Sequence, residues 1–129
     1  MDIKRLDHAN LRTTRLDEMV EWYGRVLHMF PGDRPPFDFP GAWLYRHGQA
    51  LVHLVGADAP GTTENLAMEH YALQATGLTD FLNHMQTHNV ETRIGKLPEF
   101  GIIQVNIWDP DGNHIHVDFP RDEGLAAGF

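Results

Sequence analysis

Four of the nine histidines in this 129-residue chain stand at matching positions in its two halves. The interval from His8 to His70 is nearly the same as the interval from His53 to His116. Imidazole is the commonest metal ligand in proteins, and a transition metal needs three or four donors about 2 Å from one point. We therefore predict that these four side chains converge on one metal-binding cavity.

The other five histidines have simpler interpretations. His28, His84 and His88 fall near predicted helix ends, where a cation interacts favourably with the helix dipole. His47 falls in a predicted tight turn. His114 has the strand parity of the last ligand candidate, so a place facing the cavity, beside a ligand, is a minor alternative to an ordinary surface or core position.

The elements that must position these histidines follow the same order in both halves. In the first half we predict a strand at 3–13, a helix at 15–28 and a hairpin of strands 42–46 and 49–55. Between helix and hairpin lies the segment 31–41, whose four prolines exclude a helix. Each half places one histidine on its first strand and another on its last, as a metal centre between the halves requires.

The second half begins after a predicted linker at 56–65. We predict a strand at 66–76, a helix that begins near Leu78, and strands at 90–94, 102–108 and 113–119. The tail, 120–129, has no clear period. Repetition at this spacing predicts two copies of one supersecondary unit within a single domain, 1–129.

Composition excludes several classes of protein. The formal charge is −8 with no basic run, which argues against a nucleic-acid partner. No apolar run approaches the roughly 18 residues of a membrane span, and the first residues do not resemble a signal peptide. The chain has no cysteine, which excludes disulfides and thiolate ligands and is typical of a cytoplasmic protein.

A second group of residues is expected to border the cavity. The proline-rich segment and the strand after it supply four aromatic side chains and one cation: Arg34, Phe37, Phe39, Trp43 and Tyr45. Such a wall suits a flat, anionic aromatic ligand, although Phe37, Phe39 and Trp43 could equally belong to the core. Gln104 and Asn106 share one strand parity and would offer amide hydrogen bonds to a substrate.

Four segments of the chain resemble the vicinal oxygen chelate superfamily, which contains glyoxalases, bleomycin resistance proteins and extradiol dioxygenases. LDHANLRTTRLDEMVEWYGRVLHM resembles its first strand and helix, ALVHLV its fourth strand, EHYALQATGL its fifth, and DPDGNHIHVDF its closing hairpin. The resemblance covers nearly the whole chain. It implies an α+β fold of two βαβββ modules, about 3–55 and 66–119, that form an open, curved mixed sheet around a metal. It also implies a homodimer.

The resemblance assigns roles to the histidines. By position, His8, His70 and His116 fall where three metal ligands of the family lie. His53 falls on the fourth ligand position of glyoxalases and on the acid/base histidine of extradiol dioxygenases, so either role is implied. Nitrogen donors favour a divalent transition metal, with Fe(II) expected first and Mn, Zn or Ni as alternatives.

This chain departs from the family where a carboxylate is usual. The family commonly has glutamate where this chain has His116, and glyoxalases commonly have another where it has His53. Glyoxalase-type isomerisation needs a carboxylate at the metal. The favoured function is therefore a dioxygenase-like enzyme that cleaves the ring of a small, anionic aromatic substrate. A glyoxalase-like lyase, isomerase or hydrolase that uses metal-activated water is the first alternative. A non-catalytic antibiotic-binding protein is the second.

Overall fold

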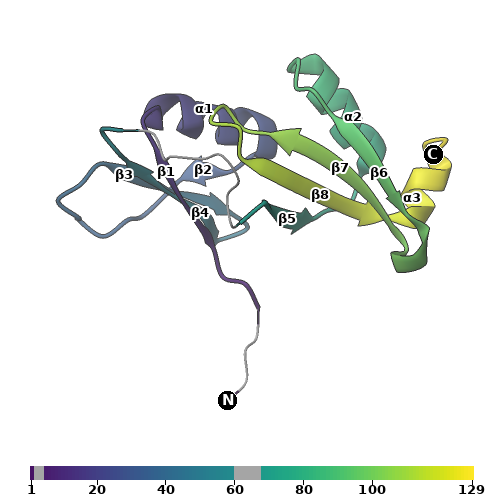
Figure 1. Ribbon diagram of the computed structural model, residues 1–129, viewed down its shortest axis with the longest axis horizontal. Helices are drawn as coiled ribbons and strands as arrows, with labels where there is room; N and C mark the ends of the chain where they lie inside the picture. The colour runs from purple at the N-terminus through teal and green to yellow at the C-terminus, as the bar shows by residue number, and fades with distance from the viewer. Residues whose placement is uncertain (2–4, 60–67) are drawn as a thin grey trace. The chain divides into compact units, whose positions relative to one another are not determined.

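The computed structural model describes residues 1, 5–59 and 68–129, which form two units, Met1–Glu64 and Asn65–Phe129. Each unit runs from a strand through a helix to three further strands, and each contains one open four-stranded sheet (Figure 1). This is the predicted α+β fold of two βαβββ modules. The boundary between the units falls within the predicted linker. Among the described residues, no helix has the length and apolar character needed to cross a membrane.

In the first unit, the sheet has the strand order β1-β4-β3-β2, with β1 and β4 parallel and the other pairs antiparallel. Leu11, Leu44 and Leu54 on one face of this sheet are buried, as are Met19 and Tyr23 of the helix. The elements are β1 (Ala9–Thr13), α1 (Leu16–Leu27), β2 (Phe30–Pro31), β3 (Gly41–Arg46) and β4 (Gln49–Gly56). The apolar face of the sheet and the apolar stripe of α1 therefore form the core of this unit.

In the second unit, the sheet has the equivalent order β5-β8-β7-β6, with β5 and β8 parallel. Phe81 of the helix lies against Phe119 of the last strand, with ring centroids 5.3 Å apart. The elements are β5 (His70–Gln74), α2 (Leu78–Thr87), β6 (Arg93–Leu97), the 3-10 turn η1 (Pro98–Phe100), β7 (Ile102–Trp108), β8 (His114–Pro120) and α3 (Arg121–Ala126). Both units thus have the same sheet, with a parallel pair of strands at one edge.

The hairpin turn is confirmed, but several strand boundaries differ from the prediction. His47 and Gly48 have φ values of 51° and 76°, the left-handed conformation that a tight hairpin turn requires. The strand predicted at 90–94 begins only at Arg93, because the N–H of Val90 bonds to the carbonyl of Met85 and closes the end of α2. His8 lies directly before β1 rather than on it, and residues 2–4 and 66–67 of the predicted strands lie outside the described residues.

Helix α3 was not predicted, because the tail has no apolar period. Within this helix, the side chain of Glu123 places its Oε2 atom 2.8 Å from the backbone nitrogen of Gly77 and 2.7 Å from that of Leu78. These two N–H groups begin α2, where Gly77 itself supplies no side-chain cap. A carboxylate at a helix N-terminus satisfies otherwise unpaired donors and opposes the positive end of the dipole. The contact therefore fixes α3 against α2.

Candidate metal centre

Three histidines gather on one face of the second sheet. His70 pairs with His114 across the parallel strands β5 and β8, and His116 stands two residues further along β8. Their side chains share a face because Ile115 and Val117, which alternate with them, are buried on the other. One ring nitrogen from each of the three lies within 4.8 Å of the others. This part of the predicted site is therefore assembled within one unit.

The same ring arrangement occurs in both units. The rings of His70 and His116 stack with centroids 3.9 Å apart and planes 15° apart, and those of His8 and His53 do so with the same values. The predicted equivalence of these positions in the two halves thus has a structural counterpart, because each half brings its two histidine rings into direct contact. The sharing of one metal by both pairs stays a prediction.

His8, directly before β1, and His70, the first residue of β5, are each bonded to the acidic residue just before them. Asp7 Oδ2 lies 2.8 Å from His8 Nδ1, and Glu69 Oε2 bonds His70 Nδ1. These hydrogen bonds are the main reason that the pKa values of Asp7 and Glu69 lie below those of ordinary carboxyl groups. The sequence analysis did not identify either carboxylate. The interval between them, which equals that between the histidines that follow them, could have done so.

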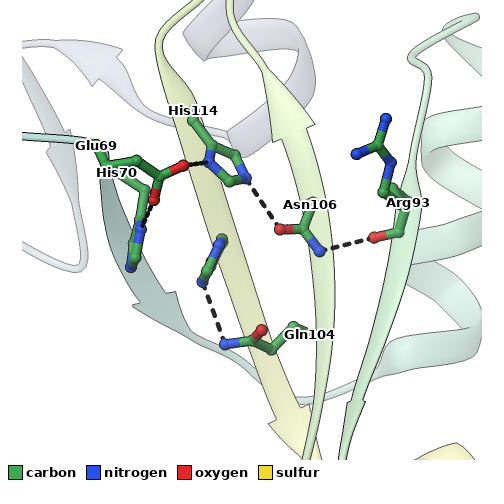
Figure 2. A network of polar contacts seen from close by, with 7 residues as sticks. Glu69, His70, Arg93, Gln104, Asn106 and His114 are labelled. Carbon is green, nitrogen blue, oxygen red and sulfur yellow. Dashed lines mark hydrogen bonds and ion pairs between the residues drawn. The ribbon is translucent and has the colours of Figure 1, made fainter. Parts of the chain in front are cut away.

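His114 is held at both ring nitrogens (Figure 2). Its Nδ1 lies 2.8 Å from Glu69 Oε1 and its Nε2 lies 2.9 Å from Asn106 Oδ1. Asn106 donates its amide N–H to the carbonyl of Arg93 at 2.9 Å, which fixes the amide oxygen toward the imidazole. The ring of Trp108 stacks on His114, with centroids 5.0 Å apart. Glu69, Asn106 and Trp108 therefore hold the ring of His114 beside those of His70 and His116.

Gln104 contacts the other last-strand histidine. Its Nε2 lies 3.1 Å from His116 Nδ1. Rotation of the Gln104 amide would present its oxygen instead. That oxygen would accept a hydrogen from Nδ1 of His116 and leave the Nε2 atom of the His116 ring with a lone pair. Gln104 and Asn106 therefore both hold histidines, and their predicted contacts with substrate stay a prediction.

Electrostatics favour neutral imidazole rings at His53 and His116, the last-strand histidines of the two units. Burial lowers the pKa values of His53 and His116, and the neighbouring His8 and His70 respectively lower them further. A neutral imidazole retains the lone pair that binds a metal, whereas a protonated one does not. The half-buried rings are thus suited to ligation at neutral pH.

The donor set fits a divalent transition metal. At bond lengths near 2.1 Å, two nitrogens on one metal lie at most about 4.2 Å apart. The ring nitrogens of His70, His114 and His116 lie within 4.8 Å of one another, so an ion bound among them would require these rings to move slightly closer together. A carboxylate on Nδ1 is also the usual partner of a metal-bound histidine. The nitrogen donors favour iron, nickel, copper or zinc over magnesium and calcium.

One further carboxylate lies on the same face. Asp118 follows His116 by two residues on β8 and pairs with Gln74 on one side and Gln104 on the other. Its Oδ1 is buried and has no hydrogen-bond partner among the described residues. A buried, unpartnered carboxylate oxygen is unusual and requires an explanation. Strand parity with His116 could have identified it from the sequence.

The predicted aromatic residues form a wall beside His53 in the first unit. Trp43 stacks on His53, with centroids 4.2 Å apart and planes 8° apart, and Phe37 lies 6.4 Å from Trp43. The guanidinium of Arg34 lies 4.9 Å from the ring centre of Phe37 and 5.0 Å from that of Phe39. Phe37 and Phe39 are 45% and 40% exposed, so the alternative that they are core residues does not hold for them.

Arg34 and Tyr45 also hold the proline-rich segment itself. Arg34 Nη2 donates to the carbonyl of Phe39 at 2.9 Å, and the hydroxyl of Tyr45 donates to the carbonyl of Asp33 at 2.7 Å. A side chain at Gly32 would lie 2.6 Å from the Tyr45 ring, so glycine is required there. Tyr45 therefore anchors the segment that carries the wall, and its predicted contact with substrate stays a prediction.

Comparison with known proteins identifies the family. A model of the glyoxalase/bleomycin resistance protein/dioxygenase superfamily matches residues 5–117. The chain belongs to this superfamily. A relative from Arabidopsis thaliana, named Glyoxylase I 4, is 30% identical over 121 residues, which cover 87% of this chain and 68% of the relative. The superfamily includes metal-dependent enzymes such as glyoxalase I.

Solved structures of the superfamily share the fold. A glyoxylase/bleomycin resistance protein/dioxygenase domain from Frankia sp. EAN1pec has a TM-score of 0.77 at 18% identity, covering 94% of this chain and 95% of that one. The trypanothione-dependent glyoxalase I of Leishmania major has a TM-score of 0.67 at 18% identity, covering 97% and 91%. The fosfomycin resistance protein FosX of Listeria monocytogenes has a TM-score of 0.69 at 13% identity, covering 92% and 94%. At these identities the likeness establishes the fold alone.

Proposed function

We propose that this protein is a metal-dependent enzyme whose metal is held by imidazoles. His8, His70 and His116 are the ligands, and His53 is either a fourth ligand or the acid/base of the reaction. The observation that carries the proposal is the cluster of His70, His114 and His116, whose ring nitrogens lie within 4.8 Å of one another on one face of the second sheet. Fe(II) is the favoured metal, with Mn, Zn and Ni as alternatives.

The favoured reaction is ring cleavage of a small, anionic aromatic substrate of the extradiol type. A bound divalent metal would polarise two adjacent oxygens of such a substrate. Trp43 would pack on a flat ring, since it is already stacked on His53. His53 has a lowered pKa, so its neutral form is able to accept a proton from a substrate hydroxyl at neutral pH.

A second candidate is an isomerase, lyase or hydrolase of the glyoxalase type. It is supported by the name of the Arabidopsis relative and by Asp118, the carboxylate beside His116. Such a reaction would need Asp118 to move a proton, because neither His53 nor His116 is a carboxylate. A non-catalytic binding protein is the remaining alternative, and it would bind a ligand without turnover. In all cases we expect a cytoplasmic homodimer with a small-molecule substrate.

Metal analysis and an oxygen-dependent assay test the proposal. The purified protein is reconstituted anaerobically with Fe(II), and turnover of catechols is measured with and without dioxygen. Ring cleavage requires dioxygen, whereas isomerisation and hydrolysis do not. His70→Ala and His116→Ala should lose metal and activity, while His47→Asn, in the exposed hairpin turn, should retain both. Full metal content in both ligand variants would contradict the proposed centre.

A further inference from the structure

We infer that Asp7 and Glu69 are positioning residues that fix the ring orientation and tautomer of the proposed ligands His8 and His70. This inference rests on the proposed function, since it concerns His8 and His70 as ligands. Each carboxylate immediately precedes its histidine and contacts the Nδ1 atom. The two pairs occupy equivalent places in the two modules, so the contact repeats with the fold.

The chemical consequence concerns the nitrogen that faces a metal. A carboxylate only accepts hydrogen bonds, so the Nδ1 atom that meets it must carry the hydrogen. The neutral ring then has its lone pair on Nε2, at the far end of the ring from the backbone. A histidine without such a partner distributes its hydrogen between both nitrogens and rotates more freely. Asp7 and Glu69 thus prepare His8 and His70 to bind through Nε2.

The two carboxylates differ in length, and the structure gives a reason. Glu69 spans two strands: one oxygen bonds His70 on β5 and the other bonds His114 on β8, as Figure 2 shows. In the first module the position equivalent to His114 is Leu51, which offers no second imidazole. Asp7 correspondingly has a single imidazole contact, for which the shorter side chain is sufficient. The extra methylene of Glu69 is therefore matched to its second contact.

Stability alone does not account for these pairs. The side chains of Asp7 and Glu69 are 77% and 70% exposed, and exposed ion pairs contribute little to the free energy of folding. A purely structural role would therefore leave metal affinity unchanged when the carboxylates are replaced. A positioning role predicts the reverse, with folding nearly unchanged and metal affinity reduced.

Zinc titration of the whole protein is the first measurement. Asp7→Asn and Glu69→Gln replace each carboxylate by an amide, which can donate to Nδ1 and so favour the wrong tautomer. We expect each variant to bind Zn²⁺ about 10- to 100-fold more weakly, as is usual when such partners are lost. Glu91→Gln, an exposed carboxylate outside the site, removes the same charge and should bind as the native protein does.

Imidazole ¹⁵N spectra of the metal-free protein provide a second measurement, independent of the metal. In the native protein His8 and His70 should show hydrogen on Nδ1. Glu69→Gln should change His70 and leave His8 unchanged, and Asp7→Asn should do the opposite. Glu69→Asp should lose the contact with His114 and give an intermediate zinc affinity, because the shorter side chain cannot span both strands.

The outcomes separate this inference from the proposed function. If His8→Ala and His70→Ala bind zinc as tightly as the native protein, the proposed centre is wrong. If those variants lose zinc while Asp7→Asn and Glu69→Gln bind within twofold of the native protein, the positioning role is wrong. Loss of affinity in all four, with altered tautomers in the carboxylate variants, supports both.

Discussion

The rings of His53 and Trp43 stack with centroids 4.2 Å apart and planes only 8° apart. On its other side His53 stacks on His8 at 3.9 Å, so one imidazole joins the aromatic wall to the candidate ligand. A substrate ring that packs on this wall would therefore lie beside the candidate ligands of the first unit. This relationship links substrate binding to the chemistry that the histidines can perform.

The aromatic wall should contribute directly to ligand affinity. Trp43→Leu removes the stacked indole but leaves an apolar side chain on β3. We expect the dissociation constant of a catechol to rise about two- to tenfold, since an aromatic pair is worth about 0.5–1.5 kcal/mol beyond its area. Isothermal titration measures this, with Phe100→Leu in the exposed turn of the other unit as the control. An unchanged constant would exclude Trp43 from the binding site.

Replacing His116 by glutamate should change ligand preference more than metal content. An imidazole-only centre keeps the full charge of about +2, whereas one carboxylate lowers it to about +1. We predict that His116→Glu retains a metal but binds an anionic catechol at least about tenfold more weakly relative to a neutral isostere. Titration with both compounds tests the charge argument. Tighter catechol binding by the variant would refute it.

Acidification should destabilise the metal-free protein. Burial lowers the pKa values of His53 and His116 below their ordinary value of 6.5, so the folded state holds these rings neutral where the unfolded chain would protonate them. Their contribution to stability is therefore complete above about pH 6.5 and is lost as the pH falls through the lower folded values. Urea unfolding between pH 7.5 and 5 should show this decline, and His53→Gln should weaken it. An identical decline in that variant would exclude His53 as a cause.

Metal affinity should fall over the same range of pH. Ligand histidines must be neutral, so protons compete with the metal as the pH drops through roughly 6. Zinc titrations at pH 7.5, 6.5 and 5.5 should give progressively weaker binding. Affinity that stays constant down to pH 5 would indicate carboxylate ligands, and Asp118 would then be the first residue to test.

The contact between α3 and α2 should contribute to stability without affecting the metal centre. Glu123→Gln weakens the acceptor that meets the N–H groups of Gly77 and Leu78. We expect the free energy of unfolding to fall by about 0.5–1 kcal/mol, a typical value for a helix cap. Asp122→Asn removes the same charge from the same helix and should have a smaller effect. Equal losses in the two variants would show that the cap contributes nothing.

The sequence by itself determined the repeated modules and the equivalent positions of four histidines in them. The shared strand parity of His114 and His116 predicted that they lie on one face, because strand geometry has a period of two, and the burial of Ile115 and Val117 on the other face agrees with it. The equivalence of His8 with His70, and of His53 with His116, likewise followed from the sequence repeat alone. Such local and periodic signals depend on no contact between distant segments.

Tertiary structure decided the contacts that no period encodes. The bridge from Glu69 to His114 joins residues 45 positions apart, and its existence depends on the register of β5 against β8. The cap that Glu123 supplies to α2 depends on where the aperiodic tail folds back. Strand β6 starts late because a backbone hydrogen bond at Val90 completes the preceding helix. Hydrogen bonds are directional and short, so only the folded chain determines which donors and acceptors meet.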